Sequence, residues 1–120
     1  MNEVTIVFPA LNEAGRLPQT LEKYTKYFGE RAILLVVDNG STDGTTQIVK
    51  RLSESNPQIN ALFFEKPLGK GGAVYAGFEA SQTKIIWFTD CDGAVSPIVF
   101  DQLIRALPAG DLVIASRWSN

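Results

Sequence analysis

Two carboxylates, Asp90 and Asp92, stand one residue apart at the end of an apolar run, 85-IIWFTDCDG-93. Negative charges this close repel each other, and burying them is unfavourable unless a cation or hydrogen-bond donors balance them. A hard divalent cation accepts such oxygen ligands and can keep positions open for a diphosphate. Alternatively, Asp90 caps one turn, and Asp92 with Gly93 makes another. The pair therefore predicts a metal site, with two ordinary turns as the alternative.

A third acid, Asp38, follows another apolar run and begins the segment 38-DNGSTDGT-45. At the carboxyl end of a strand, its carboxylate could accept hydrogen bonds from a nucleobase or from ribose hydroxyls. A turn at Asn39-Gly40 and a helix cap at residues 41–43 explain the rest of the segment without any ligand. Asp38 is therefore a candidate nucleoside contact.

Lys70 lies in a glycine-rich segment, 67-PLGKGGA-73, where close backbone approach and positive charge at a helix N-terminus could favour a phosphate. The segment is not a Walker A loop, because Phe64 and Gly71 replace the first glycine and the Ser/Thr of that motif. Val74 likewise excludes G-x-G-x-x-G. The alternative for Lys70 is a solvated lysine at a glycine-rich helix entry.

Arg117 ends a further apolar run, 111-DLVIASRW-118. An arginine at the end of a strand could make a paired contact to a phosphate, although by itself a surface position explains it equally well.

Five short apolar runs, rich in β-branched residues, predict the strands that position these side chains: 4–8, 32–37, 61–64, 85–89 and 112–115. Their near-continuous apolar character is typical of strands covered on both faces. Helical spacing is found between them, at residues 17–28, at 48–52 after the caps at 41–43, at 73–80, and at 100–107 after Ser96-Pro97. The alternation predicts an α/β fold with a mostly parallel, twisted sheet and helices on both faces, whose ligand site lies at the carboxyl ends of the strands.

The composition of the chain excludes several classes of function. A chain of 120 residues fits one domain, 1–120, and its net charge of -2 gives no basic field for nucleic acid. No apolar run approaches the roughly 18 residues of a membrane span, and the N-terminus lacks the pattern of a signal peptide, so a cytoplasmic location is expected. With one cysteine and no histidine, the chain has no Ser-His or Cys-His nucleophile pair and no histidine-based zinc site.

Taken in order, five segments resemble the inverting family 2 glycosyltransferases of the GT-A fold, and most closely the dolichyl-phosphate mannose synthase and polyprenyl-phosphate glycosyltransferase branch. These segments are 9-PALNE-13, 38-DNGSTDGT-45, 69-GKGGA-73, 90-DCD-92 and 115-ASR-117. The resemblance implies a Rossmann-like nucleotide-diphospho-sugar transferase fold, of which residues 1–120 form the N-terminal, donor-binding part. That catalytic domain is about twice as long, so the chain is interpreted as truncated.

The resemblance also implies roles for individual residues. Pro9, Leu11 and Glu13 would line the base and ribose pocket, and Asp38 with Asn39 would contact the base. Asp90 would hold ribose or metal-bound water, and Asp92 would bind Mg²⁺ or Mn²⁺ across the donor diphosphate, so Asp90 and Asp92 are the metal candidates. Lys70 and Arg117 would lie near the phosphates.

Two residues depart from the family pattern. Asn39 stands where the family commonly has a second aspartate, which leaves base preference open. Ala94 stands where the polyprenyl branch commonly has glutamine, which leaves the cation one ligand short.

The function implied by the resemblance is metal-dependent, inverting transfer of a hexose from a GDP- or UDP-sugar to a polyprenyl (dolichyl) phosphate or another acceptor, at the cytoplasmic face of a membrane. One alternative is a nucleotide-binding fragment or regulatory module without catalysis. Another, a nucleotidyltransferase, is disfavoured because its glycine-rich lysine loop usually follows the first strand. The exposed edge of a fifth strand also offers a route to a homodimer.

Overall fold

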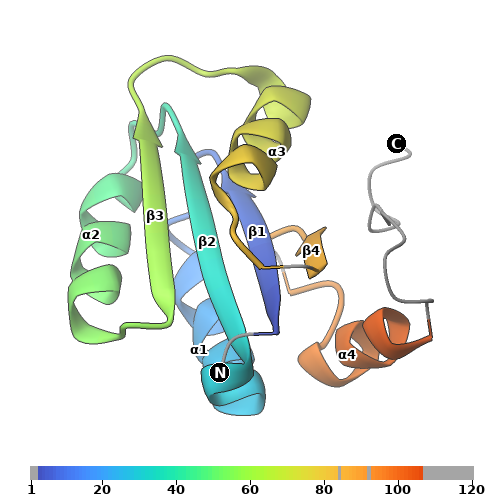
Figure 1. The fold of residues 1–120 in the computed structure, drawn as a ribbon. Helices are drawn as coiled ribbons and strands as arrows, with labels where there is room; N and C mark the ends of the chain where they lie inside the picture. The colour runs from blue at the N-terminus through green and yellow to red at the C-terminus, as the bar shows by residue number, and fades with distance from the viewer. Residues whose placement is uncertain (1–2, 84, 92, 107–120) are drawn as a thin grey trace.

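The computed structural model describes residues 3–83, 85–91 and 93–106. Within them, four strands form a parallel sheet in the order β3-β2-β1-β4 (Figure 1). The strands are β1 (Val4–Ala10), β2 (Ala32–Asn39), β3 (Ile59–Phe64) and β4 (Ile85–Phe88). The helices are α1 (Leu17–Phe28), α2 (Thr45–Ser55), α3 (Gly69–Ala80) and α4 (Pro97–Arg105), and a short 3-10 helix (Gly29–Arg31) follows α1.

Helices cover both faces of the sheet, as the sequence predicts. In Figure 1, α3 lies in front of β1 and β2, and α1 lies behind them. Helix α4 packs beside α1, where the Tyr24 ring meets Phe100 edge-on at 5.8 Å between centroids. The α/β architecture expected from the sequence, a parallel sheet with helices on both faces, is therefore observed for the part of the chain that the structure describes.

The core lies between the two central strands and these helices. Ile6, Val7 and Phe8 of β1 are completely buried, so this strand has no solvent-facing side. The small-residue face of α3 brings that helix close to the sheet, because a Cβ atom at Gly77 would lie only 2.5 Å from Cγ1 of Val7. This packing fixes the start of α3 relative to the ends of β1 and β2.

The first four predicted strands are confirmed, but β1 and β2 run further than predicted and include Pro9 and Asn39. Proline fits here because β4 pairs with β1 only between Val4 and Val7, so no strand lies beside Pro9 on that edge. The predicted fifth strand, 112–115, lies outside the described residues.

One predicted helix cap differs from the structure. Helix α2 begins at Thr45 with Gly44 as its N-cap, in place of residues 41–43, because Gly44 adopts the positive φ of 100° that this turn requires. Helix α3 begins at Gly69, within the segment 67–73 that was predicted as a helix entry, so Lys70 lies at the helix N-terminus as expected. The start of α4 is confirmed, since the Ser96 hydroxyl accepts a hydrogen bond from Val99 N at 3.3 Å. In the described part of the chain, no helix is long and apolar enough to cross a bilayer.

Candidate functional site

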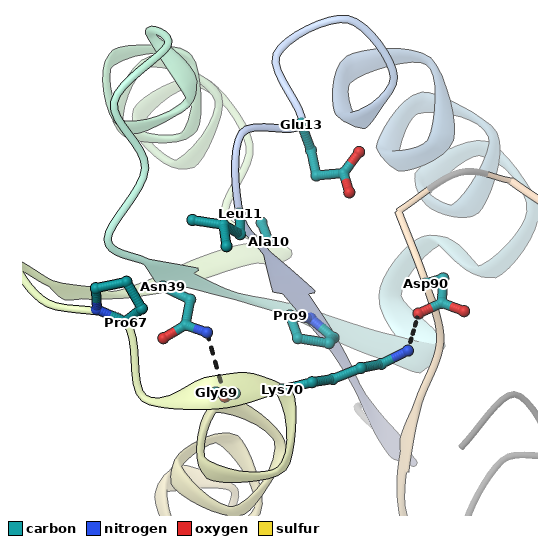
Figure 2. Close-up of a pocket in the computed structure, with 9 residues that line it drawn as sticks. All are labelled: Pro9, Ala10, Leu11, Glu13, Asn39, Pro67, Gly69, Lys70 and Asp90. Atoms are coloured by element: carbon teal, nitrogen blue, oxygen red, sulfur yellow. Dashed lines mark hydrogen bonds and ion pairs between the residues drawn. The ribbon is translucent and has the colours of Figure 1, made fainter. Parts of the chain in front are cut away.

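A pocket of about 230 Å³ opens at the carboxyl end of the sheet, where parallel α/β proteins place their ligands (Figure 2). Six of the residues predicted from the sequence line it: Pro9, Leu11, Glu13, Asn39, Lys70 and Asp90. Ala10, Pro67 and Gly69 complete the lining. The structure therefore brings together residues from four separate segments of the chain.

One side of the pocket carries Leu11 and Glu13. Behind Glu13, two segments bond to each other, residues 12–14 after β1 and residues 41–45 after β2; we call them the loop wall. Asn12 has a positive φ of 56°, and its side-chain carbonyl accepts a hydrogen bond from Thr42 N at 2.7 Å. Its own N–H donates to the Ser41 hydroxyl at 3.0 Å. Asparagine tolerates this backbone conformation better than most residues, so it suits a reciprocal bond between the loops.

Two further bonds complete the loop wall. Glu13 N donates to the hydroxyl of Thr45, at 3.0 Å, and Ala14 N donates to a carboxylate oxygen of Asp43, at 3.3 Å. The Thr45 side chain in turn donates to Asp43, and this hydrogen bond lowers the pKa of Asp43 below its ordinary value. Glu13 is held on its other side by Arg16, whose Nη2 lies 2.8 Å from Oε1. The loop wall thus fixes the backbone that carries Glu13.

The opposite side of the pocket is formed by residues 66–70, which run from the end of β3 into α3; we call this segment the strap. Asn39 at the end of β2 holds it through two bonds, from Leu68 N to Oδ1 at 2.6 Å and from Nδ2 to Gly69 O at 3.2 Å. Figure 2 shows the Lys70 side chain extending past Pro9 to Asp90, where Nζ and Oδ1 lie 2.7 Å apart. The strap therefore reaches from β2 to the end of β4.

Asp38, predicted to contact a base, does not line this pocket. Its side chain is 2% exposed, accepts a hydrogen bond from Ser41 N at 3.2 Å and another from the Thr46 hydroxyl, and borders a separate pocket beside Lys50 and Phe63. Successive side chains of a strand point to opposite faces of the sheet, so Asp38 and Asn39 bond to different neighbours. The structure thus gives Asp38 the place of a residue that ties β2 to α2.

Of the two predicted metal ligands, the structure describes only Asp90. Asp90 lines the pocket, whereas Asp92 and Arg117 lie outside the described residues. Within residues 3–83, 85–91 and 93–106, no three His, Cys, Asp or Glu side chains cluster in a way that could hold a metal ion. The Lys70 ammonium beside Asp90 shows that this carboxylate takes a cationic partner inside the pocket.

A second cluster of charged side chains, which was not predicted from the sequence, lies at the opposite end of the sheet. Asp101 accepts hydrogen bonds from Tyr27 at 2.8 Å, Arg31 at 3.3 Å and Arg105 at 3.1 Å. Burial acts to raise the pKa of Asp101, but these partners outweigh it, and the pKa lies below its ordinary value. Because its carboxylate is used to join α1 to α4, Asp101 acts as a structural acid. The i,i+4 spacing of Asp101 and Arg105 was a signal for one of these contacts, whereas nothing in the sequence connects Asp101 with Tyr27 and Arg31, which lie 70 or more residues away.

The sequence model of the family described as Glycosyl transferase family 2 matches residues 5–120. The chain is 36% identical over 111 residues to Dolichyl-phosphate beta-glucosyltransferase ALG5C of Trichomonas vaginalis, covering 86% of this chain and 33% of that protein. It is 33% identical to Dolichyl-phosphate beta-glucosyltransferase of Saccharomyces cerevisiae, covering 87% of this chain and 34% of that protein.

Among solved structures, the mannosyltransferase PcManGT from Pyrobaculum calidifontis, in complex with GDP-Man and Mn²⁺, is similar to this chain. Its TM-score is 0.71 at 29% identity, and the match covers 87% of this chain and 31% of that one. The chain thus spans about a third of the length of these relatives.

Proposed function

The chain belongs to glycosyl transferase family 2, and we propose that its pocket binds the nucleoside diphosphate of a GDP- or UDP-hexose. We further propose that residues 1–120 form the donor-binding part of one glycosyltransferase domain. The observation that carries the proposal is the gathering of Pro9, Glu13, Lys70 and Asp90 around one pocket at the carboxyl end of the sheet. The similarity to a mannosyltransferase that binds GDP-Man and Mn²⁺ supports it.

In this proposal the nucleoside lies against Pro9, Leu11 and Glu13, whose backbone the loop wall holds. Pro9 and Leu11 supply apolar surface for the base, and Leu11 is 45% exposed, so a stacked base would remove it from water. Glu13 lines the same pocket and can accept hydrogen bonds from ribose hydroxyls. The proposal gives Asp38 no contact to the base, because its oxygens already accept hydrogen bonds from Ser41 N and the Thr46 hydroxyl.

The phosphates would lie against the strap. Helix α3 begins at Gly69 and Lys70, both of which line the pocket, so the N–H groups of its first turn and the Lys70 ammonium are available to an anion. We propose Arg117 as a second phosphate contact, as the resemblance of 115-ASR-117 to the family implies.

Asp90, together with Asp92, would hold Mg²⁺ or Mn²⁺ next to the diphosphate. The residues fit such an ion, because Asp90 offers a hard oxygen ligand on the pocket side and already balances a positive charge there. When bound, the ion supplies positive charge to the leaving diphosphate. Lys70 would shift from Asp90 toward the phosphates as that charge develops.

For the acceptor we propose a polyprenyl phosphate, on the basis of the similarity to two dolichyl-phosphate beta-glucosyltransferases. The acceptor's phosphate oxygen would attack the anomeric carbon in line, the bond to the diphosphate would break, and the configuration would invert. A phosphate oxygen is already charged, so the reaction needs no general base. The contribution of this chain is then to orient the donor and stabilise charge on the leaving group.

Calorimetry of the complete protein with UDP and GDP, with and without Mn²⁺, tests the donor site. We expect one nucleotide to bind, and Asp90→Asn to weaken binding about tenfold in the presence of Mn²⁺, as loss of one charged contact predicts. Glu54→Gln, at an exposed carboxylate of α2, is the matched control and should bind like wild type. A folded protein that binds neither nucleotide would contradict the proposal, whereas binding without hexose transfer would support a binding module.

A further inference from the structure

Asn39 is one of the two residues at which the sequence departs from the pattern it resembles, and it also holds the strap. It is 4% exposed at the end of β2, and its side-chain amide bonds to the backbone of Leu68 and Gly69. These bonds have opposite polarity, because Leu68 donates to Oδ1 while Nδ2 donates to Gly69 O. An amide satisfies both at once.

A carboxylate in the same place could make only one of these bonds. It could accept from Leu68 N, but its second oxygen would face the Gly69 carbonyl oxygen without a proton between them. Leu68 is the N-cap of α3, and its own apolar side chain cannot accept a hydrogen bond at the helix start. Asn39, a residue of β2, therefore caps α3 by accepting the hydrogen bond from Leu68 N.

The strap also touches the residue that directly follows β2. Gly40 has a φ of 84°, and a Cβ atom built on it would lie 2.9 Å from the Pro67 ring. The end of β2 and the strap are thus in direct contact over two consecutive residues. Because Lys70 follows Gly69 directly, holding Gly69 sets where the Lys70 side chain starts.

From this geometry we propose that Asn39 is a positioning residue for the phosphate end of the pocket and does not read the base. Its amide holds the strap against β2, and the held strap directs Lys70 across Pro9 to the place where a nucleoside diphosphate carries its charge. The inference rests on the proposed function, since it assigns the diphosphate to Lys70.

The test compares nucleoside with nucleoside diphosphate in the complete protein. Asn39→Ala removes both bonds to the strap without adding charge, and it should weaken binding of UDP or GDP about tenfold, as expected for loss of a positioned contact. Binding of uridine or guanosine should change less than about twofold, because the loop wall is intact. Hydrogen exchange of residues 66–70 should become faster in Asn39→Ala.

Two further variants separate positioning from base reading. If Asn39 acts through Lys70, the two substitutions are coupled. Lys70→Met should then weaken diphosphate binding far less in the Asn39→Ala variant than in wild type. Asn39→Asp, the residue common in the family, should also speed exchange in the strap, since it cannot donate to Gly69 O. Asn60→Ala, at an exposed asparagine of β3, is the matched control and should behave like wild type.

The outcomes distinguish this inference from the proposed function. If wild type binds neither UDP nor GDP, the donor site itself is wrong. If wild type binds but Asn39→Ala weakens nucleoside and diphosphate equally, or if Asn39→Asp tightens binding with unchanged exchange in the strap, Asn39 reads the base and the inference is overturned. Additive effects of Asn39→Ala and Lys70→Met would overturn it as well.

Discussion

The two sides of the pocket are held by different kinds of bond. In the loop wall, backbone N–H groups of residues 12–14 and 42 donate to short side chains that include Ser41 and Thr45. The strap is held by one buried amide, Asn39, and by one ion pair between Lys70 and Asp90. The side chains of that pair are 45% and 23% exposed.

This difference indicates which side of the pocket is preformed. Short side chains lose little rotamer entropy when they bond to the backbone, whereas fixing a lysine costs up to about 2 kcal/mol. A partly exposed ion pair contributes only about 0.2–1 kcal/mol to the free energy of unfolding. We therefore expect the loop wall to be preformed without a ligand, and the Lys70 end of the strap to exchange Asp90 for another anion.

The largest effect is expected where the two sides of the pocket meet, at Gly40. Gly40→Ala places a Cβ atom 2.9 Å from the Pro67 ring at a φ of 84°, which L-residues disfavour. We expect the free energy of unfolding to fall by about 3 kcal/mol, measured by denaturant titration.

Gly15→Ala is the control for this change, because no atom lies within 4 Å of a Cβ built there. It should shift the free energy of unfolding by less than about 0.5 kcal/mol. Wild-type stability of Gly40→Ala would show that β2 and the strap do not touch in solution.

An intermediate effect is expected inside the loop wall. Thr45 is fully buried, and Thr45→Val keeps its shape but leaves Glu13 N–H and Asp43 without their shared partner. The free energy of unfolding should fall by about 2 kcal/mol, the usual consequence of an unpaired buried polar group.

Thr25→Val is the matched control, since the Thr25 hydroxyl bonds to Glu22 O within the exposed surface of α1. Its stability should differ from wild type by less than about 0.5 kcal/mol. If Thr45→Val is equally mild, the loop wall is not held by this bond, and the contrast between the two sides of the pocket weakens.

The smallest effect on stability is expected at the ion pair of the strap. Lys70→Met should change the free energy of unfolding by less than about 0.5 kcal/mol, because the pair is partly exposed. The same variant should weaken binding of UDP or GDP about tenfold, as measured by calorimetry.

Lys50→Met serves as the control, since Lys50 Nζ lies 5.5 Å from the Phe63 ring centroid and borders a different pocket. Neither its stability nor its nucleotide binding should change markedly. A large loss of stability in Lys70→Met would mean that the strap is as rigidly held as the loop wall.

Most elements of the fold could be predicted from the sequence, for a physical reason. Continuous apolar runs such as 32–37 predict a strand covered on both faces, and β2 is observed there. The errors are at the ends of elements. Residues 41–43 have the composition of a helix cap, yet the chain uses them to bond with the loop after β1, and α2 starts after Gly44.

The candidate site was predicted in part. Pro9, Lys70 and Asp90 line one pocket as expected, because parallel strands end at the same edge of the sheet. Asp38 was expected beside them, but alternation along β2 turns it toward α2. The predicted roles of Asp92 and Arg117 remain predictions, since both residues lie outside the described part of the chain.

The sequence by itself determined the α/β order, the family and the segments that supply the pocket, because these depend on local pattern and on motifs that are each contiguous in the chain. Only the tertiary structure decided which of two neighbours, Asp38 or Asn39, faces the pocket. It alone showed that the Asn39 amide holds Leu68 and Gly69, about thirty residues away in sequence. Such contacts depend on the distance between segments in space, which spacing along the chain does not encode.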